Sequence, residues 1–243
     1  MEALHHKLPE KTPPYRPHQG PHRQYIRDII LGVNDGLVSI FLLVVGVVGG
    51  GFESREVLLA GLAGAIAGAV SMAAGEYMAT KSQEEVFESE MELEREHLKY
   101  YRDIEREEIR DMFGDIGIEG QSLESIVDSL DRNDEAFMKV MMALEFGIVE
   151  TERRSPTKAM LTSGILFLTG AAPSLVPFIF ISSATAALVW AAIGSGLALF
   201  AVGAAKTLAT RKNPLRSGFE NLGVAAAGAA AAFTIGLAYN TYV

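Results

Sequence analysis

Two carboxylates and one thioether stand out because they lie in otherwise apolar stretches of the chain: Asp35, Met72 and Glu76. A carboxylate inside a membrane span costs about 2.5 to 3.5 kcal/mol, so such residues usually face a pathway or a partner. Met72 and Glu76 are four residues apart and share one helix face. Counted inward at about 1.5 Å per residue from the same side of the membrane, the three lie about 6 to 12 Å deep. Carboxylates with a thioether suit Fe²⁺ or Mn²⁺, so this layer predicts a transition-metal site.

Each of these residues also has an ordinary structural interpretation. Asp35 could form a hydrogen bond between helices, with Asn34 or with a serine, and Met72 taken alone is more typical of packing. Glu76 could be a solvated carboxylate at the end of its helix. The shared depth of the three side chains is the observation that favours a metal site over these alternatives.

A second group lies in an acidic, helix-forming segment and consists of Glu94, His97, Glu105 and Glu108. On a continuous helix these side chains, with Tyr101, fall within an arc of about 80°. A helix so rich in glutamate presents an acidic face in many directions, so a solvated face is the alternative. Like charges aligned on one face are unfavourable unless a cation arrives, and this favours metal binding.

Further along, Met141, Met142 and Glu145 share a helix face with Met138. A methionine stripe at this spacing is typical of a packed core, but these residues could also close a metal cage against the glutamates. Glu94 and His97 have the Glu-x-x-His spacing of di-iron bundles, which need two such pairs, and His97 is the only histidine outside residues 1–24. Nucleotide-binding and hydrolase motifs are absent from the sequence, so we expect no enzyme and no prosthetic group.

The elements that must position these residues are membrane helices. Four stretches carry at most one charge each: residues 29–51, 57–80, 159–205 and 221–243. A membrane helix needs about 20 apolar residues, so the 47-residue stretch supplies two spans with a break near residues 182–183. The sequence therefore predicts an all-α integral membrane protein with five transmembrane helices. Pro173 and Pro177 should kink or locally open the third span, and the glycines of the first two spans suit either packing within the chain or a dimer seam.

Residues 81–158 form an insert between spans two and three that holds 22 of the 30 acidic residues. We expect one helix over residues 76–113, about 57 Å long, then helices over 122–130 and 133–150, capped by Ser122 and by Asn133 or Asp134. Gly114 and Gly117 should end the first of these. The predicted division is a disordered tail (1–24), spans one and two (25–80), the cytosolic metal-binding insert (81–158) and spans three to five (159–243).

Charge and composition place these parts and exclude several partners. Lysine and arginine gather in the N-terminal tail and in residues 206–216, whereas the opposite side has only Arg55. The positive-inside rule then puts the tail and the insert in the cytosol and the C-terminus outside. The acidic balance argues against nucleic acid as a partner. The absence of cysteine excludes disulfide scaffolds, Fe–S clusters and thiolate zinc sites.

Two motifs are similar to those of a known family. The run GVNDGLVS at residues 32–39 resembles the first-span signature of the vacuolar iron transporter family, and SMAAGEY at 71–77 resembles its second-span signature. The order of two spans, an acidic insert and three spans also fits. The resemblance implies a homodimer that moves Fe²⁺, and often Mn²⁺, out of the cytosol in exchange for protons.

Carried over by position, the resemblance assigns translocation to Asp35, Met72 and Glu76. It assigns metal binding by the insert to six matching positions: Glu94, Glu105, Glu108, Met141, Met142 and Glu145. His97 stands where another glutamate is expected, which could alter metal choice or make binding more sensitive to pH. We expect a prokaryotic plasma membrane, with a vacuolar membrane as the other option. A membrane-anchored metal sensor, and a ferroxidase or iron store built on the insert, are the competing functions.

Overall fold

The computed structural model describes residues 23–147, 154–207 and 212–242, and over these residues the chain is helical without a strand. Of the predicted tail (1–24), residues 1–22 lie outside the described residues, and residues 23–24 belong to α1, which begins at Arg23. The helices are α1 (Arg23–Gly49), α2 (Ser54–Tyr100), α3 (Arg102–Asp115), α4 (Gly120–Asp131), α5 (Asp134–Leu144), α6 (Pro156–Phe180), α7 (Ala184–Ala205) and α9 (Pro214–Tyr242).

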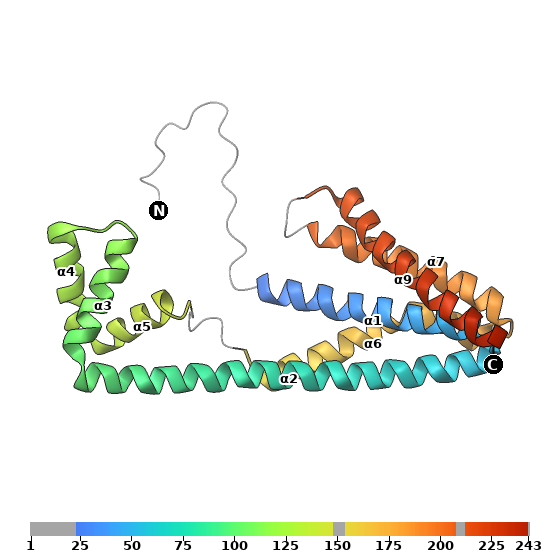
Figure 1. Ribbon diagram of the computed structural model, residues 1–243, viewed down its shortest axis with the longest axis horizontal. Helices are drawn as coiled ribbons and strands as arrows, with labels where there is room; N and C mark the ends of the chain where they lie inside the picture. Colours follow the sequence, from blue (N-terminus) through green and yellow to red (C-terminus); the bar gives the residue numbers. More distant parts are fainter. Residues whose placement is uncertain (1–22, 148–153, 208–211, 243) are drawn as a thin grey trace, which may run out of the picture.

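Five of these helices, α1, α2, α6, α7 and α9, are long and apolar enough to cross a membrane, which confirms the five predicted spans. The uncharged 47-residue stretch divides between Phe180 and Ala184, as expected. The C-terminal end of α9 returns to the α1–α2 turn (Figure 1). The rings of Phe52 and Tyr239 stack there, with their centres 5.9 Å apart. The helices α3, α4 and α5 gather instead around the far end of α2.

Glycines bring α1 and α6 into backbone contact. A Cβ atom added at Gly36 would lie 2.0 Å from the carbonyl oxygen of Phe167, and one at Gly170 would lie 2.1 Å from that of Val33. Only glycine fits at such a contact, which is how small residues hold membrane helices together. The glycines of span one therefore pack within the chain. Gly75 differs, since a Cβ there would meet nothing within 4 Å.

The third span, α6, remains one α-helix through Pro173 and Pro177, so of the kink or local opening predicted there, the opening does not occur. Close to these prolines the buried hydroxyls of Ser174 and Ser195 share a hydrogen bond of 2.9 Å, which joins α6 to α7. Packing of α6 against its neighbours keeps the helix continuous where proline removes a backbone donor.

The predicted continuous helix over residues 76–113 is also wrong, because α2 ends at Tyr100. Tyr101 leaves the helical conformation (φ −128°, ψ 28°) and α3 starts at the next residue. Burial explains the break. Leu98 and Ile109, one on each side of it, join the same hydrophobic core, together with Val127, Phe137 and Met141. A straight helix would hold Leu98 and Ile109 about 16 Å apart, so tertiary packing overrides local helix propensity here.

The two remaining helices of the insert correspond to the expected ones with shifted ends. Gly117, with a φ of +89°, follows α3 as predicted. The next helix, α4, starts at Gly120 with Glu119 at its N-cap, so Ser122 is not the cap. Asn133 caps α5 as predicted, since its side-chain oxygen accepts from the backbone N–H of Ala136 at 3.1 Å. This helix ends at Leu144 rather than at 150.

Candidate functional site

Asp35 and Met72 line one cavity of about 320 Å³ between α1, α2 and α6. The Ser39 hydroxyl, one turn further along α1, donates to Asp35 Oδ1 at 3.0 Å. The glycines at 64 and 68 contribute backbone rather than side chains to the wall, and Phe167 closes it from α6. The cavity therefore offers a carboxylate, a hydroxyl and a thioether, a mixed set of donors that suits a transition-metal ion.

The side chain of Asp35 is exposed in a single copy of the chain, although it lies in the middle of an apolar helix. Its hydrogen bond to Ser39 lies within α1, and among the described residues Asp35 does not form the hydrogen bond to another helix that was the alternative interpretation. Asn34 instead accepts from the side-chain amide of Asn221 at 2.8 Å, and the same amide donates to the Leu199 carbonyl. This contact fixes the rotation of α1 against α9 and turns Asp35 towards the cavity.

Glu76 does not line this cavity. Its Oε1 lies 3.7 Å from Nη1 of Arg154, and the second terminal nitrogen of Arg154 contacts Asp28. The predicted layer of three ligands is thus divided: Asp35 and Met72 meet at the cavity, and Glu76 lies one helical turn further along α2, in an ion pair. The sequence analysis missed Asp28 and Arg154, whose charges flank spans one and three.

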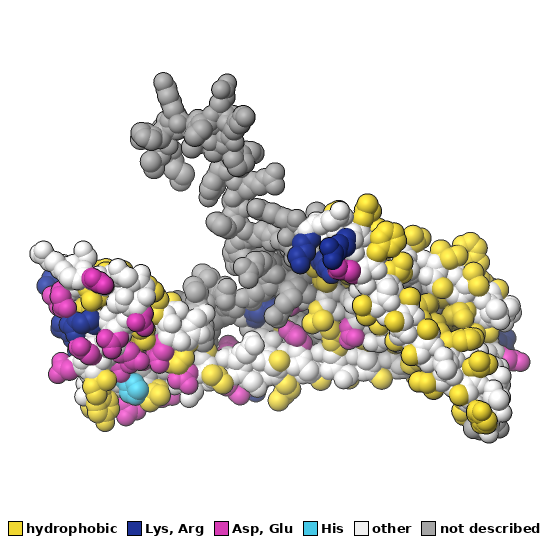
Figure 2. Space-filling view, turned by 45° about the horizontal axis from the view of Figure 1, so that its top comes forward, with side chains coloured by type: hydrophobic (Ala, Val, Ile, Leu, Met, Phe, Trp, Pro, Cys, Tyr) yellow, Lys and Arg dark blue, Asp and Glu magenta, His cyan; other side chains and the backbone are white. Residues whose placement is uncertain are grey.

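In the insert, Glu94, His97 and Glu105 come together from α2 and α3, with one potential ligand atom from each all within 4.8 Å of one another. His97 Nδ1 lies 3.2 Å from Glu105 Oε1. The turn at Tyr101 makes this possible, because Glu94 and Glu105 on a straight helix would be about 16 Å apart along its axis. Figure 2 shows acidic side chains gathered over this end of the molecule.

The two glutamates of this trio are buried, with Glu94 at 4% and Glu105 at 3% exposed. Glu94 Oε1 and Glu105 Oε2 lack a hydrogen-bond partner among the described residues. Burial, followed by repulsion from Glu105 and Glu145, raises the pKa of Glu94 to about 7. Burial and then Glu108 also raise the pKa of Glu105, against the opposing effect of His97. Buried carboxylates with unsatisfied oxygens are stabilised by a cation, so the trio has the chemistry of a metal site.

Further acidic groups surround the trio. Burial raises the pKa of Glu145 first, and then Glu108, Glu105 and Glu90 add to the rise. Glu108 and Glu145 were both predicted to belong here, whereas the sequence analysis missed Glu90. The signal for Glu90 was available, because it precedes Glu94 by four residues and so shares its helix face.

The two methionines of α5 have different surroundings. Met141 is fully buried and belongs to the hydrophobic core around Phe137, which supports its interpretation as a packing residue. Met142 is 5% exposed but is not a member of that core cluster. Of the two, Met142 is therefore the better candidate for a thioether ligand.

The basic residues of α3 face a different set of acids. Arg102 Nε donates to Asp131 Oδ1 at 2.7 Å, Arg106 contacts both Asp128 and Asp131, and Arg110 pairs with Glu124. The hydrogen bond from Arg102 lowers the pKa of Asp131. These pairs connect α3 to α4 and neutralise the arginines, which leaves the glutamate cluster without a basic side chain of α3 among its contacts.

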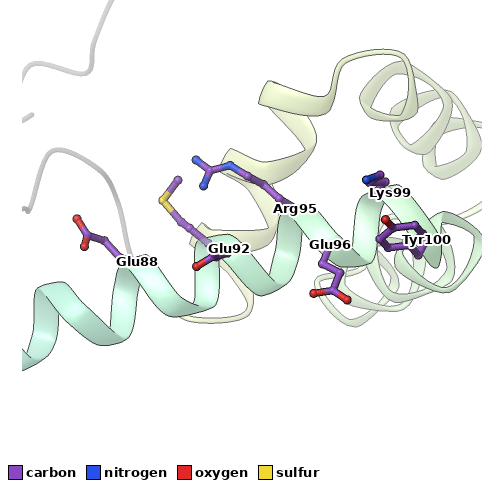
Figure 3. A pocket seen from close by; sticks show the side chains of 7 residues that line it. Glu88, Glu92, Arg95, Glu96, Lys99 and Tyr100 are labelled. Atoms are coloured by element: carbon purple, nitrogen blue, oxygen red, sulfur yellow. The ribbon is translucent and has the colours of Figure 1, made fainter.

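A groove along the exposed side of α2 is lined only by that helix, by Glu88, Met91, Glu92, Arg95, Glu96, Lys99 and Tyr100 (Figure 3). Both acidic and basic side chains line it, and Lys99 Nζ lies 4.7 Å from the centre of the Tyr100 ring. Mixed charges on a single helix provide no converging donors, so this groove lacks the features of a metal site.

Comparison with known proteins adds a family match. A model of the VIT family matches residues 26–237. A protein named vacuolar iron transporter 1 from Arabidopsis thaliana is 35% identical over 212 residues, 87% of this chain and 85% of the relative. Its namesake from Oryza sativa subsp. japonica is 32% identical over 239 residues, 96% and 95% of the two chains. A vacuolar iron transporter from Toxoplasma gondii is 27% identical over 220 residues, 84% and 73% respectively. The family match spans both the membrane helices and the insert.

Proposed function

Because this chain belongs to the VIT family, we propose that it exports Fe²⁺ from the cytosol in exchange for protons and that it also carries Mn²⁺. The chain is an integral membrane protein with five spans, and its relatives bear the names of metal transporters rather than of enzymes. The observation that carries the proposal is the carboxylate of Asp35 beside Met72, in a cavity within the membrane helices. The metal in this account is cargo, and the chain needs no prosthetic group.

The insert, residues 81–158, acts as the cytosolic metal-binding domain. Its net charge raises the local concentration of cations, as an acidic surface does for any counter-ion. Glu94, His97 and Glu105 form the first site, with Glu108 and Glu145 close by and Met142 as a thioether donor. The excess of lysine and arginine in the tail and in residues 206–216 supports a cytosolic position for this side of the molecule.

From the insert the ion passes along α2 to Glu76 and then to the cavity with Asp35 and Met72. Proton exchange follows from the ligands, because a proton and a metal ion compete for the same carboxylate oxygens. An ion arriving from the cytosol releases a proton from the site, and a proton arriving from outside helps to release the ion. Met72 adds a preference for softer ions over Mg²⁺ and Ca²⁺.

A homodimer is part of the proposal. The exposed Asp35 would face lipid in an isolated copy, where a carboxylate is costly. A second copy against α1 would cover it and place two such carboxylates beside one pathway. The glycines of α1 that could otherwise form a seam already pack within the chain, Gly32 and Gly36 against α6 and Gly46 and Gly49 against α9, so the contact involves the face of α1 that carries Asp35.

The relatives are named for the vacuole, and this supports an internal membrane of that kind for the present chain. The prokaryotic plasma membrane stays a prediction that the comparisons do not support. The two competing functions differ from transport in a measurable way, because neither a sensor nor a ferroxidase needs to move an ion through α1 and α2.

The proposal is tested with purified protein in vesicles that contain a fluorescent metal chelator. We expect Fe²⁺ and Mn²⁺ to enter when the vesicle interior is acidic, the interior to become more alkaline as they enter, and entry to slow when the gradient is collapsed with an ionophore. Metal entry that ignores the proton gradient would refute the exchange mechanism. An absence of entry, with tight metal binding by the insert, would favour a sensor or store.

A further inference from the structure

Arg154 joins three membrane helices at the end of the bundle nearest the insert. It lies directly before Ser155, the N-cap of α6, and reaches Asp28 on α1 and Glu76 on α2. All three side chains are largely covered, with exposures of 16% for Arg154, 18% for Asp28 and 28% for Glu76. The cluster lies one helical turn along α2 from Met72, between the cavity and the long part of α2 that leads to the insert.

The contacts of the guanidinium with Asp28 and with Glu76 differ in strength. Nη2 is in close contact with Asp28, whereas Nη1 is 3.7 Å from Glu76, well beyond the usual 2.7 to 2.9 Å of a charge-assisted hydrogen bond. Arg154 is therefore anchored on Asp28 and holds Glu76 only loosely. Two largely buried carboxylates near one another require a nearby positive charge, and here a side chain supplies it.

We propose that Arg154 is a tethered counter-cation, which occupies Glu76 between transport events and keeps hard divalent cations off the Asp28–Glu76 pair. This inference rests on the proposed function, in which Glu76 receives the ion before the cavity does. An arriving Fe²⁺ draws the loosely held Glu76 away, and Arg154 stays on Asp28. The ion is not retained by both carboxylates, so it moves on to Asp35 and Met72.

The chemistry of the ligands gives this cation a role in selectivity. A pair of carboxylates without sulfur or nitrogen is a ligand set that suits Ca²⁺ and Mg²⁺ as well as it suits Fe²⁺. With Arg154 in place, one carboxylate is neutralised and only the other can be drawn away. Met72, in the cavity that also holds Asp35, then selects for a softer ion.

The test compares Arg154→Gln with Arg154→Lys, which retains the charge, and with Arg216→Gln as a matched control. Arg216 pairs with Glu220 on the same helix and its side chain is 83% exposed. In the vesicle assay we expect Arg154→Gln to lower the KM for Fe²⁺ about tenfold, since a unit charge a few ångströms from the ligand is lost. We also expect a lower kcat and inhibition by Ca²⁺. Lysine should restore both constants, and the control should behave like the unaltered protein.

Asp28→Asn provides a second and opposite test. It removes the anchor, so Arg154 moves fully onto Glu76 and the KM should rise. A KM and a Ca²⁺ sensitivity unchanged in Arg154→Gln, or a KM that falls in Asp28→Asn, would overturn the inference.

Calcium binding measured by calorimetry separates this inference from the proposed function. Arg154→Gln should gain one Ca²⁺ site per chain relative to the unaltered protein. If the unaltered protein moves no metal but the variant gains this site, transport is refuted, and what remains of the inference is that Arg154 keeps hard cations off the two carboxylates. If the unaltered protein transports and the variant gains no site, the counter-cation role is refuted alone.

Discussion

The raised pKa of Glu94 predicts how metal binding by the insert depends on pH. With a pKa of about 7, this carboxyl is about nine-tenths ionised at pH 8 and about one-tenth ionised at pH 6. A metal ion binds the ionised form, so at pH 6 it must first displace a proton. This one group therefore weakens binding about tenfold between pH 8 and pH 6. The raised pKa values of Glu105 and Glu145 act in the same direction.

The assay is calorimetry of Mn²⁺ binding to the detergent-solubilised full chain in two buffers with different ionisation enthalpies. The affinity should fall at least about tenfold from pH 8 to pH 6, and close to one additional proton should be released per ion at pH 6. Glu94→Gln should weaken binding at pH 8. The ratio of the affinities at pH 8 and pH 6 should be about tenfold smaller in this variant than in the unaltered protein. Glu96→Gln, an exposed carboxylate two residues away, is the control. An affinity equal at both pH values, or a full pH dependence in Glu94→Gln, would refute the reasoning.

Three further substitutions test the fold that holds the sites. Phe137→Ala should destabilise the insert by about 3 to 5 kcal/mol, because the ring is fully buried, and this is measured as a loss of its helical signal on heating. Asp131→Asn should destabilise the insert at pH 7, where the Asp131 carboxylate is ionised and paired with Arg102. At a pH below the lowered pKa of Asp131 the carboxyl is protonated in the unaltered protein too, so the substitution should not destabilise the insert there. Chemical denaturation at both pH values checks this. Gly36→Ala should lower the melting temperature, because its Cβ would lie 2.0 Å from the Phe167 carbonyl oxygen, whereas Gly223→Ala, with nothing within 4 Å, should not.

Hydropathy was sufficient to predict the membrane part of the fold. Each span is set by a local property, a run of about 20 residues with at most one charge. Gly114 and Gly117 marked the end of α3 in the same local way. The end of α2 at Tyr100 could not be predicted from a local property of this kind. Residues around it are good helix formers, and the break appears only because Leu98 and Ile109 must enter one core.

The candidate site also has features that local spacing predicted and features that depend on tertiary packing. The helix face shared by Glu94, His97 and Glu105 was visible in the spacing, but their meeting within 4.8 Å depends on the break at Tyr101. Glu76 was predicted to share a layer with Asp35 and Met72. Its contact with Arg154 joins positions 78 residues apart in the sequence, and no local pattern indicates such a pair.

The measurement that tests the central claim most directly is metal entry into acidic-inside vesicles for the unaltered protein and for Asp35→Asn. Asparagine keeps the size of the side chain but removes the charge that binds the ion and exchanges the proton. We expect proton-coupled Fe²⁺ entry to be lost in the variant, while calorimetry shows Mn²⁺ binding by its insert unchanged. Proton-coupled entry at the unaltered rate in Asp35→Asn would contradict a pathway through the cavity between α1, α2 and α6.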